Sequence, residues 1–139
     1  MRDFCPDYVT ARARFRSAAI ATGASLEALP IHATGPRGEV LTIDAARVGP
    51  ADAARTVVVS SGLHGVEGYY GSAVQLQLLE RRLPYAPLPE GVSVLLLHAL
   101  NPFGMAWRRR VNEDNVDLNR NFLLPGAEYS GAPDGYAEL

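Results

Sequence analysis

Two side chains with metal-ligand chemistry lie three positions apart in residues 60–68, which read SSGLHGVEG. They are His64 and Glu67, and they follow a run of valines. Imidazole and carboxylate groups are typical zinc ligands, and a catalytic zinc ion takes three protein ligands and an open position for water. Neighbouring glycines such as Gly62 and Gly65 relieve the steric limits on the backbone and allow a tight turn around an ion. Two solvated loop residues are the competing interpretation, because an H-x-x-E spacing often occurs by chance.

A second polar segment, residues 107–122, reads WRRRVNEDNVDLNRNF and concentrates arginine and asparagine. Beside a metal ion, such side chains would bind a substrate carboxylate through paired hydrogen bonds and would offer donors to a developing oxyanion. The competing interpretation is a solvated basic loop that ends in an Asn/Asp turn.

The elements that would position the first pair form a strand–helix–strand unit. Residues 55–61 (RTVVVSS) are apolar and rich in β-branched side chains, which predicts a strand buried on both faces of a sheet. Apolar residues recur every three or four positions over 69–83 and predict a helix that Pro84 ends, and residues 92–100 predict a second buried strand. Such a unit has parallel strands and a right-handed crossover. Sites in open α/β sheets form at the carboxyl ends of strands, so His64 and Glu67 are expected at that edge.

The rest of the chain predicts one helix, one hairpin and a loop. Residues 4–22 show near-helical apolar spacing and predict an amphipathic helix. The turn sequence GPRG, residues 35–38, separates two strand-like segments and predicts a β-hairpin. From Asn101 on, the polar sequence predicts a loop. We therefore expect an α/β fold with a mostly parallel sheet and flanking helices, in a single domain over residues 1–139. That domain is expected to be truncated, because one crossover and one covered face do not complete such a sheet.

Composition excludes several functional classes. The 139 residues are 47% hydrophobic and 20% charged, which is typical of a globular protein. A formal net charge of −2 gives no indication of nucleic acid or of an anionic membrane as a partner. Cys5 is the only cysteine, so the chain forms no internal disulfide and no cysteine-based zinc cluster. Neither a secretory signal nor an apolar span is evident, so we expect a cytoplasmic protein.

Taken in order, the motifs resemble the zinc carboxypeptidase (metallocarboxypeptidase) superfamily, in an uncharacterised bacterial branch and over its N-terminal portion only. The glycine-flanked H-x-x-E follows one predicted strand, NPFG at 101–104 follows the next, and DLNRNF at 117–122 comes after both. DLNRNF is the specific part of the resemblance, which runs over residues 57–122. The resemblance implies a zinc-carboxypeptidase-like fold and a Zn2+ cofactor, with His64 and Glu67 as the first two ligands.

The resemblance also implies roles for the second segment. Asn119 and Arg120 match the pair that binds the terminal carboxylate of the substrate. Arg110 stands nine positions before Asn119, at the spacing of the catalytic arginine that polarises the scissile carbonyl. Arg108 is the competing assignment, because other members place that arginine directly after a tryptophan, here Trp107.

Two groups that the resemblance implies are missing from this sequence. The family has a histidine as third zinc ligand downstream of DLNRNF, and a glutamate general base further on. Downstream of Phe122 the sequence contains no histidine, and its only glutamates are Glu128 and Glu138. We expect His98 to be a packed residue at a strand end, and His32 to be structural or exposed.

These observations predict a zinc-dependent hydrolase that cleaves an amide bond next to a free carboxylate, and they predict little activity for the 139 residues alone. The expected partner is a peptide or an N-acyl amino acid with a free carboxylate, and the sequence does not indicate an oligomeric state. One alternative is an amidohydrolase of N-acyl amino acids that resembles aspartoacylase and succinylglutamate desuccinylase, which share H-x-x-E and a D-L-N-R motif. A second alternative is a non-catalytic module that binds carboxylates.

Overall fold

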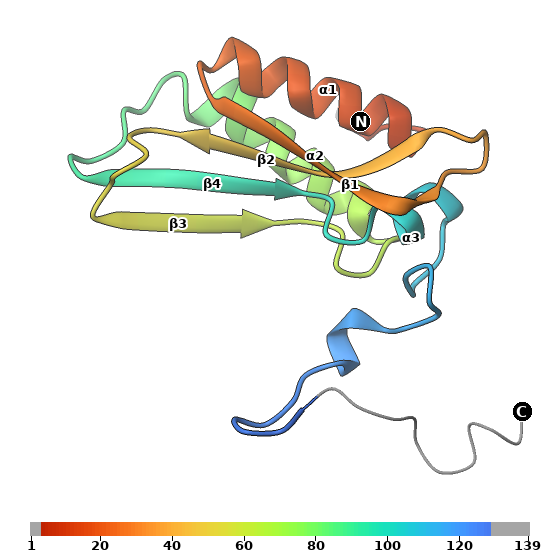
Figure 1. Cartoon of the computed structure of the whole chain (residues 1–139). Coiled ribbons are helices and arrows are strands. Elements are labelled where there is room, and N and C mark those ends of the chain that lie inside the picture. Colours follow the sequence, from red (N-terminus) through yellow and green to blue (C-terminus); the bar gives the residue numbers. More distant parts are fainter. Residues whose placement is uncertain (1–3, 129–139) are drawn as a thin grey trace, which may run out of the picture.

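The computed structural model describes residues 4–128, which form one four-stranded sheet with helices packed on it (Figure 1). The sheet has the strand order β1-β2-β4-β3, with bounds β1 (Ser25–Thr34), β2 (Val40–Val48), β3 (Arg55–Ser60) and β4 (Val92–His98). The helical elements are α1 (Tyr8–Ala21), α2 (Gly68–Gln77) with its π-helical continuation η1 (Leu78–Arg82), α3 (Pro102–Trp107) and the 3-10 turn η2 (Leu118–Arg120). Among the helices of residues 4–128, none combines the length and the apolar character that crossing a membrane requires.

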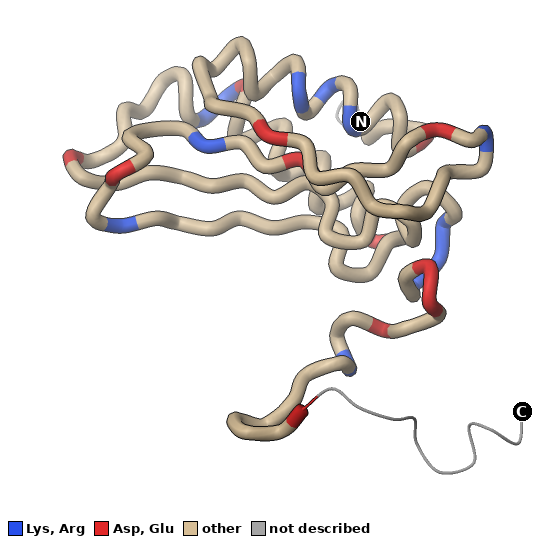
Figure 2. Tube along the Cα trace, in the orientation of Figure 1, with Lys and Arg blue, Asp and Glu red and all other residues tan. Residues whose placement is uncertain are grey.

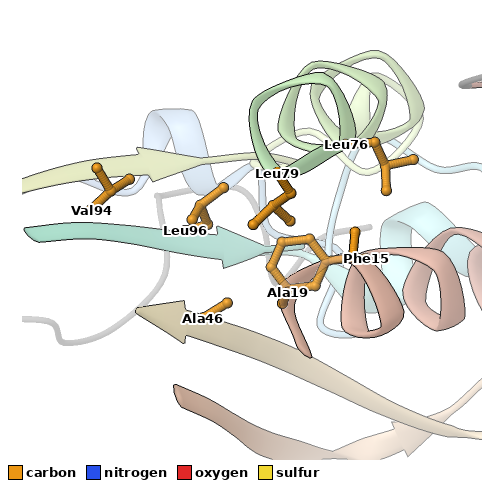
Figure 3. Close-up of a cluster of buried hydrophobic side chains, with 8 residues drawn as sticks. Phe15, Ala19, Ala46, Leu76, Leu79, Val94 and Leu96 are labelled. Carbon is orange, nitrogen blue, oxygen red and sulfur yellow. The ribbon is translucent and has the colours of Figure 1, made fainter. Parts of the chain in front are cut away.

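Helices α1 and α2 cover the same face of the sheet and form the main core with it (Figure 3). Phe15 of α1, Leu76 of α2 and Leu79 of η1 pack against Val94 and Leu96 of β4. Both predicted helices are therefore confirmed. The second keeps its helical course up to Leu83, the residue before Pro84, but its last turn is a π-helix. This packing fixes the direction in which β3 leaves the sheet toward α2.

The predicted hairpin and the predicted parallel unit are both confirmed. β1 and β2 pair antiparallel around the GPRG turn, while β3 and β4 pair parallel with α2 as the crossover. The expectation of a mostly parallel sheet is wrong, however, because β2 also pairs antiparallel with β4. The physical reason is that a hairpin docked on a single βαβ unit contributes two antiparallel pairings and leaves only one parallel pairing.

Two further expectations about the strands and loops are wrong. β3 is not buried on both faces: it lies at the edge of the sheet, and Val57 and Val58 are 52% and 56% exposed. The segment from Asn101 on is not only loop, because α3 begins there. Asn101 caps α3 by accepting a hydrogen bond from the Gly104 N–H at 2.7 Å, and Pro102 stands at a position where a missing N–H costs nothing. A six-residue helix is too short for apolar periodicity to show.

Ion pairs with one buried carboxylate, that of Asp44, connect α1 to the sheet. Asp44 of β2 is fully buried and accepts hydrogen bonds from Arg12 Nε and Arg16 Nη1 of α1, each at 2.9 Å. The Arg12 Nε also donates to the hydroxyl of Thr42 at 2.6 Å, and the Tyr8 hydroxyl bonds the Thr42 backbone. A buried anion is tolerated when it is paired and hydrogen-bonded in this way.

Candidate functional site

The loop that carries the H-x-x-E pair leaves β3 and is held against α3 by backbone contacts. The Gly62 carbonyl accepts from the Asn101 N–H at 2.8 Å, and the Val66 N–H donates to the Arg109 carbonyl at 3.1 Å. A Cβ atom on Gly65 would lie less than 3.0 Å from backbone atoms of Gly104, so only glycine fits this contact. The segment that begins at Asn101 and includes α3 therefore holds the first motif in place.

His64 lies between two carboxylates. Its Nδ1 is 3.3 Å from Glu67 Oε2, and its Nε2 is 3.1 Å from Asp117 Oδ1. The imidazole side chain is 11% exposed, whereas the Glu67 side chain is 66% exposed. The structure thus brings the two sequence-predicted ligands together and leaves the carboxylate facing solvent.

Asp117 is a residue of the candidate site that sequence reasoning missed. Its Oδ2 accepts from Arg110 Nε at 2.8 Å, and its Oδ1 accepts from the Asn119 N–H at 2.9 Å. The hydrogen bond from Arg110, followed by those from the Asn119 backbone and His64, lowers the pKa of Asp117 to about 2. The carboxylate of Asp117 is therefore an anion at neutral pH, and its Oδ1 lies within hydrogen-bonding distance of His64 Nε2. The sequence contains one signal for this role, because Asp117 is the acidic residue at the start of DLNRNF. Histidines that bind metal ions often donate a hydrogen bond to such a carboxylate.

The pair borders a pocket of about 400 Å3 at the carboxyl end of β3. Its wall includes His64, Glu67 and Asn119, together with the exposed Tyr70. The expected position at the strand end is confirmed.

Arg110 is joined to the site through Asp117, while Arg108 and Arg120 make other contacts. Arg108 has a left-handed backbone (φ 55°), and its Nη2 donates to the Pro6 carbonyl at 3.1 Å. Arg120 is exposed, and its Nη1 donates to the neighbouring Asn119 carbonyl at 3.0 Å. None of these three arginines lines the pocket beside His64.

The other two histidines lie elsewhere. His98 is fully buried, stacks on Phe15 at a centroid distance of 4.7 Å and has Nε2 2.9 Å from Ser72 Oγ. Burial lowers its pKa to about 4, so the ring is neutral at pH 7. His32 is exposed on β1. Within residues 4–128, no group of three histidine, cysteine or acidic side chains is arranged to hold a metal ion.

Comparison with known proteins identifies the family. A model of the family described as "Protein of unknown function (DUF2817)" matches residues 4–139. The chain belongs to this family. No curated protein matches this chain.

Solved structures that resemble this DUF2817 chain are bacterial glutaminyl cyclases. The enzyme of Tannerella forsythia is 12% identical with a TM-score of 0.50, and the match covers 77% of this chain and 44% of that one. The enzyme of Fimbriiglobus ruber is 15% identical with a TM-score of 0.44, and the match covers 68% and 37%. That of Porphyromonas gingivalis is 12% identical with a TM-score of 0.42, and the match covers 69% and 45%. This chain thus spans less than half of each enzyme and shares part of an enzyme fold.

Proposed function

We propose that this protein forms part of a zinc-dependent hydrolase site that cleaves an amide bond next to a free carboxylate, as metallocarboxypeptidases do. The observation that carries the proposal is the place of His64 between Glu67 at Nδ1 and Asp117 at Nε2. Histidines that bind a metal usually donate their other N–H to a carboxylate, which fixes the tautomer and the ring orientation. Asp117 fits that role because Arg110 keeps it ionised.

The distance between His64 Nδ1 and Glu67 Oε2 is compatible with both atoms binding one zinc ion. Two ligands of one tetrahedral zinc ion, each bonded at about 2.0–2.2 Å, lie about 3.3–3.5 Å from one another. His64 Nδ1 and Glu67 Oε2 are 3.3 Å apart. In the tautomer whose Nε2–H donates a hydrogen bond to the ionised Asp117, the Nδ1 lone pair faces the Glu67 carboxylate oxygen, and a cation between the two atoms would remove their repulsion. A third protein ligand would come from outside residues 4–128.

The residues of this chain would bind and orient the substrate. A zinc ion held by His64 and Glu67 would supply a water of pKa about 7 and would polarise a carbonyl. Asn119 lines the same pocket and offers an amide to the carboxylate of a peptide or N-acyl amino acid. Arg110 uses Nε for Asp117, so its terminal N–H groups are available to an oxyanion. Removing one such donor typically lowers kcat by about 10²–10³-fold.

Zinc binding tests the proposal. We expect the protein to bind zinc in competition with a chromophoric chelator, His64→Ala to abolish this binding, and Asp117→Asn to weaken it by about 10–100-fold. His32→Ala is the matched control, because His32 is an exposed histidine far from the loop in sequence. Zinc affinity that is unchanged by His64→Ala would refute the proposal.

Two other functions have specific support and separate tests. Release of C-terminal residues from peptides, compared with hydrolysis of N-acyl amino acids, distinguishes a carboxypeptidase from an amidohydrolase that resembles aspartoacylase. Within residues 4–128, His64 and Glu67 are joined beside Asn119 by no third metal-type ligand, which favours a non-catalytic carboxylate-binding module. Substrate binding that survives chelation, without turnover after zinc is added, would indicate that module.

A further inference from the structure

The ion cluster between α1 and β2 contains two cations, Arg12 and Arg16, and one buried anion, Asp44. Asp44 is fully buried and carries one negative charge, yet both Arg12 and Arg16 are paired with it. Figure 2 shows how all basic and acidic residues are distributed along the backbone. The guanidinium side chains are 29% and 34% exposed, so neither is free in bulk water. A half-buried cluster with a net positive charge attracts an anion more strongly than the same charge does in solvent.

Donor groups remain on both arginines. Arg12 uses Nε, and more weakly Nη2, while Arg16 uses Nη1. Within the part of the chain that the structure describes, no hydrogen bond or ion pair engages Arg12 Nη1, Arg16 Nε or Arg16 Nη2. An Nε and Nη2 edge of a guanidinium is the fork that binds a carboxylate through two parallel hydrogen bonds.

These arginines line a groove with an apolar wall. The groove has a volume of about 490 Å3 and runs between α1 and the start of β2, away from the His64 pocket. Val9, Ile20 and Val40 line it and are 41%, 64% and 63% exposed. Apolar side chains with this exposure gain free energy when an apolar group covers them, at about 25 cal/mol per Å2.

The acidic residue of the groove does not neutralise the arginines. Glu39 lines the rim, but its Oε2 accepts from the Arg37 N–H at 2.8 Å and its side chain packs over Gly35. No ion pair joins Glu39 to Arg12 or Arg16 within the described residues. The groove therefore offers a cationic end and an apolar wall to one ligand.

We propose that this groove binds a small carboxylate that carries an aliphatic tail. The carboxylate accepts from the free guanidinium edge of Arg16 and from Arg12, and the tail covers Ile20, Val40 and Val9. The site is separate from the H-x-x-E loop, so it does not depend on zinc or on hydrolysis.

Calorimetric titration with octanoate tests the proposal through both ends of the ligand. For a ligand of this size we expect a dissociation constant on the order of 0.1–1 mM. Acetate has the carboxylate of octanoate but lacks its aliphatic chain. 1-Octanol and octylammonium have an aliphatic chain but no carboxylate. All three are expected to bind at least tenfold more weakly. Equal affinity for acetate, or for 1-octanol, would overturn the proposal, as would the absence of octanoate binding.

Matched variants locate the site. Ile20→Glu adds a negative charge to the exposed wall, and Arg16→Gln removes the fork while Arg12 still pairs with Asp44. Each is expected to weaken octanoate binding at least tenfold, and Arg16→Lys is expected to retain part of it. Val74→Glu is the control, since Val74 is 41% exposed on a different helix. If Ile20→Glu, with an unchanged circular dichroism spectrum, binds octanoate like Val74→Glu, the groove is not the site and the proposal is wrong.

Discussion

Replacing Gly65 with alanine tests whether the H-x-x-E loop is held in place by backbone contact. A Cβ atom there would lie less than 3.0 Å from backbone atoms of Gly104 and Met105, closer than real Cβ atoms approach. No rotamer change relieves a clash with backbone, so the loop and α3 must separate by on the order of 1.5 Å, which close-packed interiors resist. The same movement stretches the 3.1 Å bond from the Val66 N–H to the Arg109 carbonyl. Overpacking costs about 1–3 kcal/mol, and a clash between backbones belongs at the upper end.

Unfolding in urea and on heating measures this cost. For Gly65→Ala we expect the free energy of unfolding to fall by about 3 kcal/mol. For a chain of this size that loss corresponds to a melting temperature lower by roughly 9–15 °C. Gly35→Ala is the control, because the three atoms nearest to the new methyl group all belong to the side chain of Glu39, which can rotate away. We expect this control to stay within about 1 kcal/mol of the wild type.

A Gly65→Ala protein that melts within about 2 °C of the wild type would refute this reasoning. It would mean that the loop shifts without cost and that the contact with Gly104 does not position the loop. If the variant is destabilised but still folded, its zinc affinity reports how closely the ligand geometry depends on this contact. A displacement of about 1 Å in such a site can lower activity about 100-fold.

Two further predictions concern titrating groups. His98 has a pKa of about 4 in the folded protein, below its ordinary value of 6.5, so the unfolded chain binds a proton that the folded chain does not. Stability is therefore complete above about pH 6.5 and falls by up to about 3 kcal/mol toward pH 4, and urea titrations of His98→Gln should lack this loss. Asp117 has a pKa of about 2, chiefly because of Arg110, so Arg110→Gln should raise it toward 3.8, as carbon-13 NMR of the carboxyl group would show. An unchanged Asp117 titration in that variant would contradict the assigned hydrogen bond.

The strand–helix–strand unit could be predicted because its strands are continuous apolar runs and its boundaries carry clear signals. These two runs flank a helix that stops before Pro84, and these features place His64 at the carboxyl end of β3. The hairpin was also predictable from its GPRG turn. Local sequence determines these features, so a single sequence is sufficient to find them.

The features that were mispredicted depend on contacts between distant segments. The sequence of residues 40–48 alone does not indicate that β2 pairs with β4. This antiparallel pairing is what makes the sheet mixed. The valines of β3 have the composition of a buried strand, yet the position of β3 at the sheet edge leaves them exposed. The role of Asp117 depends on a contact with His64 across 53 positions of sequence. Patterns over short windows do not contain such information.

The open edge of β3 has a consequence for how this protein behaves in solution. Its six residues, RTVVVS, combine β-branched side chains with no proline and no lysine, and Val57 and Val58 are exposed. Strands of this kind supply unpaired backbone groups to which other chains can add, as in fibrils. Within residues 4–128, no strand covers the outer edge of β3. We therefore expect self-association through this edge to increase with protein concentration, as analytical ultracentrifugation would show.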